Sequence, residues 1–165
     1  MTEKEISIKY NEYNTQSELS TEYRELLSEA AEACKNAYSP YSGFKVGAAV
    51  RCGDGKIVKG NNQENAAYPS GLCAERVALF TASAQNPGVE IKAIAITTES
   101  SSNSDIPVSP CGACRQVMAE YENRQGSEIE ILFSSNTGRV FKVNGVKSLL
   151  PFTFNSNHLP GNGNH

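Results

Sequence analysis

The sequence has no apolar run that approaches the roughly 20 residues of a membrane-spanning helix. Its first thirty residues also lack the apolar segment of a secretory signal peptide. Lysine and arginine are not clustered, and the formal net charge is −3, so no surface is expected to follow a nucleic acid backbone. These absences predict a cytoplasmic protein with no membrane and no nucleic acid partner, and they favour a small-molecule substrate.

Histidine is scarce, because the chain has only His158 and His165, both in a Gly/Asn-rich tail that suits rigid metal coordination poorly. Cysteine is not scarce. Five cysteines without a secretory signal are expected to stay reduced and to serve metal binding or catalysis rather than disulfides. Three of them belong to the motifs described below, and Cys34 and Cys52 are left over as small core residues.

The length of 165 residues and the hydrophobic content of 39% fit one globular domain, which we place at residues 21–154. Residues 1–20 form an N-terminal extension in which Ile6, Ile8 and Tyr10 alternate with polar residues, as in an added edge strand at residues 6–10. Residues 155–165 are expected to be a disordered tail.

Apolar periodicity predicts an α/β domain in which helices pack on a mixed sheet of about five strands. The helices are expected at residues 21–38, 73–84 and 110–121. The strands are expected at residues 44–52, 56–59, 91–98, 128–133 and 139–143, the third of them buried on both faces.

Two short motifs carry the candidate chemistry. Cys73 precedes Glu75 by two positions, and Pro110 opens a segment in which Cys111 and Cys114 stand three apart on one helical face. Cys73 and Glu75 would point about 200° apart on a regular helix, so Cys73 must lie at or near a helix start to share a site. Three thiolates hold zinc and leave its fourth position for water, as in a catalytic site.

Plainer interpretations stay open for these residues. A lone Cys-x2-Cys is also found in dithiol redox proteins and in structural zinc sites, although a closed structural site needs a fourth ligand. Glu75 would ordinarily be a solvated residue on a helix surface. Zinc with three thiolates totals −1, so Arg76 and Arg115, each directly after a site residue, are expected to offset that charge by hydrogen bonds to sulfur.

The sequence resembles the small homotetrameric cytidine deaminase family over about residues 26–154, and four motifs in order carry the resemblance. They are Tyr41-Ser42-Gly43-Phe44-Lys45-Val46-Gly47-Ala48-Ala49, Asn62-Gln63-Glu64-Asn65-Ala66-Ala67-Tyr68, Cys73-Ala74-Glu75-Arg76 and Pro110-Cys111-Gly112-Ala113-Cys114-Arg115-Gln116. The resemblance implies the three-layer α/β fold of that family. It also implies one zinc ion per subunit, bound by Cys73, Cys111 and Cys114, with Glu75 as the catalytic acid and base.

The resemblance further implies a pocket for a small nucleoside in a homotetramer with active sites at subunit interfaces. Asn62 and Glu64 would hold the ribose hydroxyls, while Phe44, Tyr68 and Ala74 would contact the nucleoside. An aromatic residue near the C-terminus would reach a neighbouring subunit's site. Alignment on Leu149-Leu150-Pro151 makes this residue Phe154, although Phe152 stands where the family often has a small residue.

The expected reaction is therefore hydrolytic deamination of cytidine and 2′-deoxycytidine to the uracil nucleosides, a step of pyrimidine salvage. The nearest alternative is a deaminase of another aminopyrimidine nucleoside such as blasticidin S. A nucleic-acid-editing deaminase is expected to show basic or aromatic strand-binding surfaces, which this acidic chain lacks. A non-enzymatic zinc module and a dithiol redox protein are the two remaining alternatives.

Overall fold

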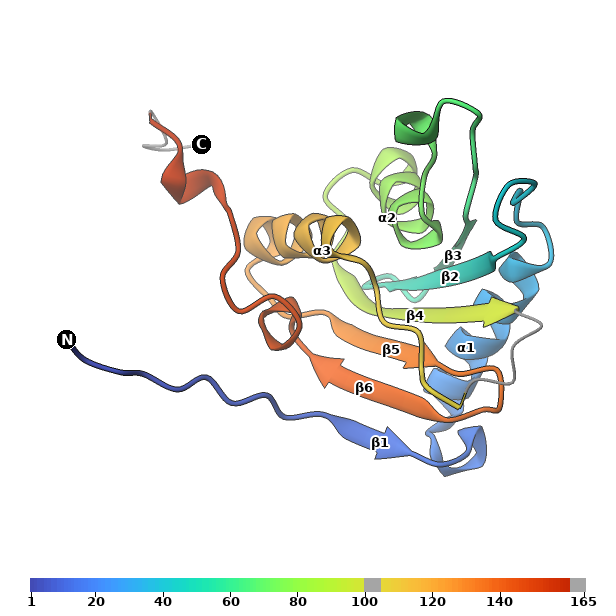
Figure 1. Ribbon diagram of the computed structural model, residues 1–165, viewed down its shortest axis with the longest axis horizontal. Coiled ribbons are helices and arrows are strands. Elements are labelled where there is room, and N and C mark those ends of the chain that lie inside the picture. Colours follow the sequence, from blue (N-terminus) through green and yellow to red (C-terminus); the bar gives the residue numbers. More distant parts are fainter. Residues whose placement is uncertain (100–104, 161–165) are drawn as a thin grey trace.

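The computed structural model describes residues 1–99 and 105–160, which form a mixed β-sheet with helices on both faces (Figure 1). The helices are α1 (Thr21–Cys34), α2 (Ala74–Gln85) and α3 (Gly112–Gln125). The strands are β1 (Asn11–Tyr13), β2 (Lys45–Cys52), β3 (Ile57–Asn61), β4 (Ile91–Glu99), β5 (Glu130–Ser134) and β6 (Val140–Asn144). Short 3-10 helices occupy Gln16–Glu18, Tyr68–Ser70, Val146–Ser148 and Ser156–His158.

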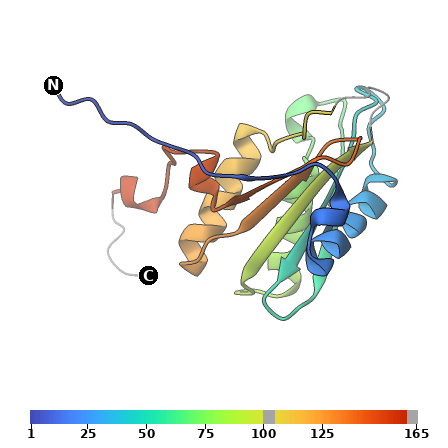
Figure 2. The same cartoon turned by 90° about the horizontal axis from the view of Figure 1, so that it is seen from below.

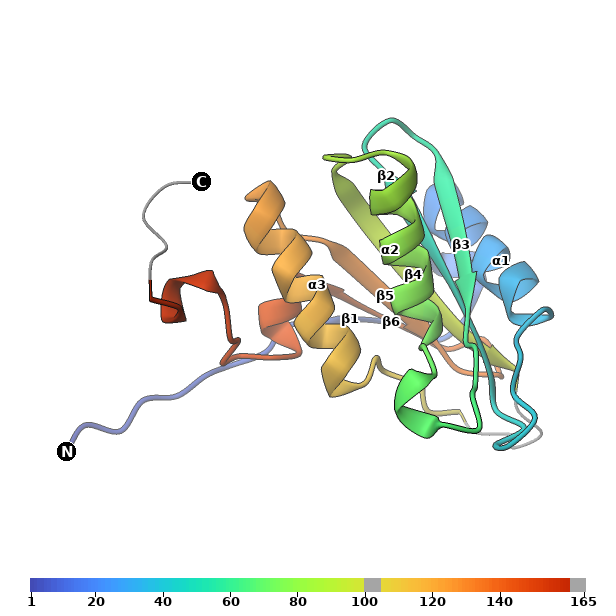
Figure 3. The ribbon, with the colours of Figure 1, turned by 90° about the horizontal axis from the view of Figure 1, so that it is seen from above.

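The strand order is β1-β6-β5-β4-β2-β3, and within it β4 and β5 are the parallel pair. Helix α1 covers one face of the sheet, while α2 and α3 lie side by side on the other (Figures 2 and 3). The three-layer α/β arrangement that the family resemblance implied is confirmed. No helix in the described part of the chain combines the length and the apolar character needed to cross a membrane.

Strand β4 shows how the two faces of the sheet are divided. Its side chains alternate, so that Ile94 and Ile96 join the core cluster that includes α2 and α3. The alternate residues Ala93 and Ala95 join the smaller cluster with Leu26 and other residues of α1. Both faces of the strand are buried, as its continuous apolar run predicted. The bulky side chains therefore fill the layer that carries the site residues.

The sheet has six strands within the described residues, one more than the five expected for the domain. The extra strand is β1, which pairs antiparallel with β6 at the edge of the sheet. Its pairing covers Asn11–Tyr13, directly after the residues 6–10 where an edge strand was expected. In the tail that was expected to be disordered, Ser156–His158 forms a 3-10 helix, and residues 161–165 lie outside the described part.

Two helix ends differ from the sequence pattern because tertiary hydrogen bonds decide them. Helix α1 stops at Cys34 rather than near residue 38, because Tyr38 instead pairs its backbone with Asn62 and Glu64. Helix α3 continues past residue 121 to Gln125, whose side-chain amide donates to the Ile91 carbonyl and accepts from the Ile91 N–H, both at 2.9 Å. Local propensity contains neither of these distant partners.

Glycine at position 60 sets how closely α2 approaches β3. A Cβ atom built on Gly60 would lie 2.4 Å from the Ala78 nitrogen and 2.6 Å from the Ala74 carbonyl oxygen, both backbone atoms of α2. Backbone atoms cannot yield as the end of a flexible side chain can. The absence of a side chain at Gly60 therefore allows the helix that carries Glu75 to pack this closely against β3.

Substituting Gly60→Ala should lower the free energy of unfolding by about 1–3 kcal/mol, the usual cost of forcing atoms into a packed core. Thermal unfolding followed by circular dichroism measures the effect. Gly112→Ala is the matched control, because a Cβ there meets no atom within 4 Å, and it should leave the melting temperature equal or slightly higher. Equal melting temperatures for Gly60→Ala and the wild type would contradict this account of the packing.

Candidate active site

The topology of the sheet brings the two cysteine motifs together. Strands β3 and β4 both pair antiparallel with β2, so they run in the same direction and end at the same edge of the sheet. The chain beyond β3 leads to α2, and the chain beyond β4 leads to α3. Both helices therefore begin near this edge, where ligands usually bind to α/β sheets.

Each of these helices starts at a cysteine. Cys73 is the N-cap of α2 with an extended backbone (φ −72°, ψ 153°), and Cys111 is the N-cap of α3 with similar angles (φ −68°, ψ 166°). The prediction that Cys73 lies at a helix start is confirmed, and its extended backbone lets it share a site with Glu75. Helix N-termini favour negative charge, so both positions stabilise a thiolate.

The sulfur atoms of Cys73, Cys111 and Cys114 all lie within 4.8 Å of one another. The Cys73 and Cys111 sulfurs are 3.9 Å apart, and the Cys111 and Cys114 sulfurs are 3.6 Å apart. All five cysteines of the chain are free thiols. Three thiolates on one tetrahedral zinc ion, at about 2.3 Å each, would lie about 3.8 Å apart. The spacing of the sulfurs therefore fits zinc.

This ligand group also leaves room for a fourth, exchangeable position. Within residues 1–99 and 105–160, the cluster consists of three cysteines, and no histidine, further cysteine or carboxylate joins them as a fourth ligand. His158 lies in the C-terminal segment, where its ring stacks on Phe154 with the ring centroids 5.5 Å apart. The described residues thus offer three ligands, the number typical of catalytic rather than closed structural zinc sites.

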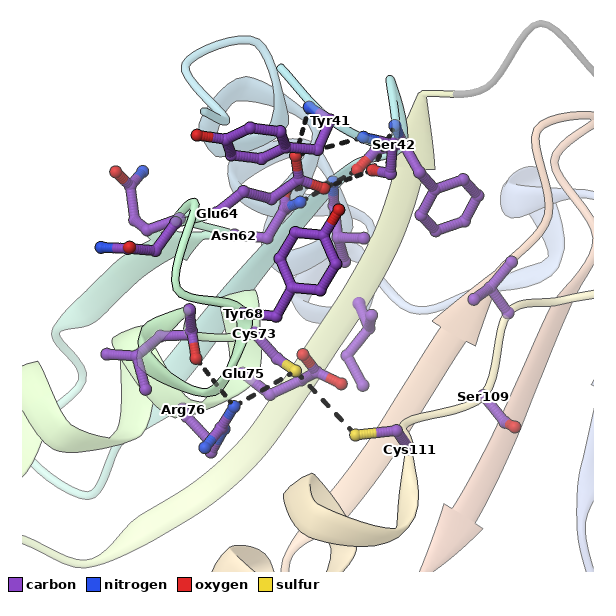
Figure 4. Close-up of a pocket in the computed structure, with 18 residues that line it drawn as sticks. Tyr41, Ser42, Asn62, Glu64, Tyr68, Cys73, Glu75, Arg76, Ser109 and Cys111 are labelled. Carbon is purple, nitrogen blue, oxygen red and sulfur yellow. Dashed lines mark hydrogen bonds between the residues drawn. The ribbon is translucent and has the colours of Figure 1, made fainter. Parts of the chain in front are cut away.

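Glu75 lies in the first turn of α2 and is only 4% exposed, unlike a solvated surface glutamate. Burial raises the pKa of its carboxyl group, and the nearby Cys73 thiolate raises the pKa further. The side chain lines the same cavity as Cys73 and Cys111 (Figure 4). A buried carboxyl group beside a metal site can exchange a proton at a pH near neutrality.

Arg76 provides the positive charge that the cluster needs. Its Nη2 atom lies 3.7 Å from the Cys73 sulfur and 3.4 Å from the Gly71 carbonyl oxygen, to both of which it can donate. The pKa of the Cys73 thiol is lowered to about 5, chiefly because the Cys114 thiol donates to its sulfur and also because Arg76 does so. The bond to sulfur predicted for Arg76 is therefore present.

Arg115 has a different role from the one expected. Its nitrogens donate to three oxygens: Nε to the Pro110 carbonyl at 2.7 Å, Nη1 to the Leu149 carbonyl at 2.8 Å, and Nη2 to the Ser109 hydroxyl at 3.2 Å. The expectation of a bond from Arg115 to sulfur was wrong in this respect. Arg115 instead fixes the segment that enters α3 and ties it to the C-terminal segment.

A cavity of about 680 Å³ opens over the sulfur cluster, a volume within the range of small-molecule sites. Of the predicted substrate contacts, Phe44, Asn62, Glu64 and Tyr68 line it. The Glu64 side chain and the sulfur cluster lie at opposite ends of the pocket, with Tyr68 between them (Figure 4). A ligand with a polar group at each end would fit this arrangement.

Asn62 holds two backbone groups of the segment that follows Phe44. Its Oδ1 atom accepts from the Val46 N–H at 2.8 Å, and its Nδ2 atom donates to the Phe44 carbonyl at 2.9 Å. A side-chain amide has two donor hydrogens and two acceptor lone pairs, so each end of Asn62 retains one further hydrogen bond for a ligand.

Two of the predicted substrate contacts lie elsewhere. Ala74 is fully buried in the core, and its contact with a substrate stays a prediction. Phe154 is 57% exposed and its carbonyl accepts from the Gln116 amide at 2.7 Å, while Phe152 is 85% exposed. Neither ring lines this chain's own pocket, so their role at a neighbouring site stays a prediction.

Sequence reasoning assigned no role to several residues of the pocket. Tyr41 and Ser42 bind the carboxylate of Glu64, and Val108 and Ser109 form the wall that precedes Cys111. Tyr41 and Ser42 stand inside a motif that carried the family resemblance, which was the signal available for them. Residues 108 and 109 had no signal beyond their position before Pro110.

In the Arg76→Gln variant, zinc should be released at a higher pH than in the wild type as the pH is lowered. Protons compete with zinc for thiolates, so zinc is retained at high pH and lost as the pH falls. Removing the cation raises the pKa of Cys73, and the midpoint of zinc release should therefore move upward by about one pH unit. A pH titration with a chromogenic zinc chelator measures the midpoint, with Arg124→Gln, on the last turn of α3, as the control. An unchanged midpoint would remove Arg76 from the cluster.

Known proteins match both the sequence and the fold. Residues 20–126 match the family described as the cytidine and deoxycytidylate deaminase zinc-binding region. The chain is 39% identical to a cytidine deaminase of Halalkalibacterium halodurans over 81% of this chain and 95% of that protein. It is 41% identical to a cytidine deaminase of Sporosarcina psychrophila over 81% of this chain and 92% of that protein.

A crystal structure of cytidine deaminase from Burkholderia pseudomallei superposes with a TM-score of 0.69 at 41% identity, and it covers 82% of this chain and 100% of that chain. The chain therefore belongs to the cytidine deaminase family.

Proposed function

We propose that the protein catalyses zinc-dependent hydrolytic deamination of cytidine and 2′-deoxycytidine, giving uridine or 2′-deoxyuridine and ammonia. One observation carries the proposal: three cysteine sulfurs with zinc spacing and a buried glutamate, Glu75, meet at one end of a cavity of about 680 Å³. A deaminase of another aminopyrimidine nucleoside such as blasticidin S is not favoured, because the similar curated proteins carry the name cytidine deaminase.

Cys73, Cys111 and Cys114 would hold one zinc ion per subunit, and zinc when bound supplies Lewis acidity that makes water acidic enough to ionise near neutral pH. Glu75 acts as the proton carrier. It takes a proton from the attacking water and passes it to N3 of the ring as the new C–O bond forms at C4. Glu75 then takes the proton of the new C4 hydroxyl group and transfers it to the amino group, so that the C4 carbonyl forms as the C4–N bond breaks and ammonia leaves.

The position of Glu75 suits both halves of this cycle. A carboxyl group that first accepts and then donates a proton works best when its pKa lies close to the working pH. Burial raises the pKa of Glu75 in that direction, and the helix start places its carboxyl group at the cavity wall.

The opposite end of the pocket would select the sugar. Asn62 and Glu64 retain hydrogen-bonding capacity toward the cavity and would hold ribose hydroxyls, while Phe44 and Tyr68 would contact the nucleoside. A site whose polar groups await hydroxyl groups rejects ligands that lack them. Free cytosine should therefore be a poor substrate.

The proposal includes the assembly and its setting. We propose a homotetramer in which Phe154 reaches a neighbouring active site, because its ring is exposed and lies outside this chain's own cavity. Tyr68, at the rim of the pocket, is 75% exposed, and its ring packs edge-on against Tyr41 with the ring centroids 6.0 Å apart. Its exposed ring leaves apolar surface that a neighbouring subunit can cover. We place this enzyme in the cytoplasm, where it would serve pyrimidine salvage.

Purified protein should deaminate cytidine and 2′-deoxycytidine, with free cytosine slower by at least about a hundredfold because the sugar contacts are missing. Ammonia release and the loss of cytidine ultraviolet absorbance measure the reaction. A zinc chelator should abolish activity and added zinc should restore it. Full activity in metal-free protein, or inhibition by thiol alkylation without inhibition by chelation, would contradict the proposal.

Substituting Glu75→Gln should retain zinc and nucleoside binding and reduce kcat by about 10²- to 10⁴-fold, the usual share of general acid–base catalysis. Metal analysis and calorimetric titration with cytidine check that the site is intact. Glu120→Gln, an exposed position on α3, is the matched control and should behave as wild type. Turnover near the wild-type rate in Glu75→Gln would exclude this residue as the proton carrier.

A further inference from the structure

The Glu64 carboxylate receives three hydrogen bonds from one short loop. Its Oε2 atom accepts from the Tyr41 N–H at 2.8 Å and from the Ser42 N–H at 3.2 Å, and its Oε1 atom accepts from the Ser42 hydroxyl (Figure 4). The pKa of Glu64 is lowered, chiefly by the Ser42 hydroxyl. Glu64 is therefore held as a carboxylate in a fixed orientation.

The backbone of the loop explains why Ser42 faces Glu64. Gly43 has φ 67°, in the left-handed region that glycine adopts without strain, and its N–H donates to the Ser39 carbonyl at 3.0 Å. This turn directs two successive backbone N–H groups and the Ser42 side chain toward β3 and the residues that follow it. The geometry is set by the backbone and does not depend on a ligand.

The Ser42 hydroxyl also links two residues of the cavity lining, Glu64 and Phe44. While its hydrogen is donated to Glu64, its oxygen accepts from the Phe44 N–H at 3.0 Å. Glu64 and Phe44 both line the cavity, and the Ser42 hydroxyl bonds to both of them. Loss of the hydroxyl would remove the one hydrogen bond that orients Oε1 of Glu64, while the Phe44 backbone would stay bound through its carbonyl to the Asn62 amide.

The carboxylate is nearly but not fully saturated. Two carboxylate oxygens offer about four acceptor positions, and the loop fills three of them. Because Glu64 lines the cavity, the remaining position can accept a hydrogen bond from a ligand there. A neutral hydroxyl donor matches this single acceptor.

We propose that Ser42 is a positioning residue that sets discrimination for the sugar, by orienting Glu64 so that its remaining acceptor meets a sugar hydroxyl. The inference rests on the proposed deamination of nucleosides. Ser42 acts through Glu64, so its removal should affect substrates only to the extent that they carry hydroxyl groups for Glu64 to bind.

The test compares Ser42→Ala with the wild type on cytidine and on 2′,3′-dideoxycytidine, whose sugar lacks the 2′ and 3′ hydroxyls. Ser42→Ala should lower kcat/KM for cytidine by about tenfold, the scale of one hydrogen bond to a charged group, and mainly through KM. It should lower kcat/KM for dideoxycytidine by less than about twofold, since no hydrogen bond to Glu64 is lost there. Ser42→Thr, which keeps the hydroxyl, should restore the preference for cytidine.

Two controls separate positioning from general damage. Ser39→Ala makes the same change in the same loop outside the cavity lining and should leave the ratio of the two kcat/KM values unchanged. In the Glu64→Gln background, adding Ser42→Ala should have little further effect, because the two residues act as a unit. Zinc content should stay at the wild-type value in every variant.

Equal losses on both nucleosides, or a loss that Ser42→Thr does not restore, would overturn the inference while leaving the deaminase proposal intact. If the wild-type enzyme deaminated neither cytidine nor dideoxycytidine, the proposed function itself would be overturned instead.

Discussion

The rest of the site depends on bringing three cysteine sulfurs to within 4.8 Å of one another. Thiolates at that distance repel, so the arrangement needs positive charge nearby. Arg76 supplies part of it through the Cys73 sulfur, and the two helix N-termini at Cys73 and Cys111 supply more. A divalent cation completes the balance, which is why this cluster is best understood as a metal site.

The same constraint places Glu75. Because Cys73 caps α2 and keeps an extended backbone, the residue two positions later enters the helix with its carboxyl group at the cavity wall. Gly60 allows α2 to lie close against β3, and Arg115 holds the entry to α3 from the other side. The end of the pocket that holds the sulfur cluster is thus built from two helix starts that the sheet aligns.

The other end of the pocket is built from loops, and it depends on hydrogen bonds rather than on packing. Asn62 and Glu64 lie just beyond β3, and each fixes backbone groups of residues 41–46. Both side chains keep one part of their hydrogen-bonding capacity for a ligand. The end with the sulfur cluster and Glu75 therefore suits reaction at a nucleobase, and the end with Asn62 and Glu64 suits recognition of a polar substituent.

Much of the fold could be predicted from local patterns. The strand at β4 and the starts of α2 and α3 follow from an apolar run and from cysteine motifs, and the structure places them within two residues of the expected positions. The ends of α1 and α3 were predicted less well. Tyr38 and Gln125 bond to partners that are distant in sequence, and no local propensity contains those partners.

The sequence by itself determined which three cysteines are proposed as ligands and that Cys73 lies at a helix start, because a regular helix would point Cys73 and Glu75 about 200° apart. Only the tertiary structure decided the roles of Arg115 and Ser42. Arg115 was a candidate by adjacency and Ser42 lay in a motif, but their hydrogen bonds reach Leu149 and Glu64, which are distant in sequence. Spacing along the chain fixes the chemistry available, and folding fixes which atoms face one another.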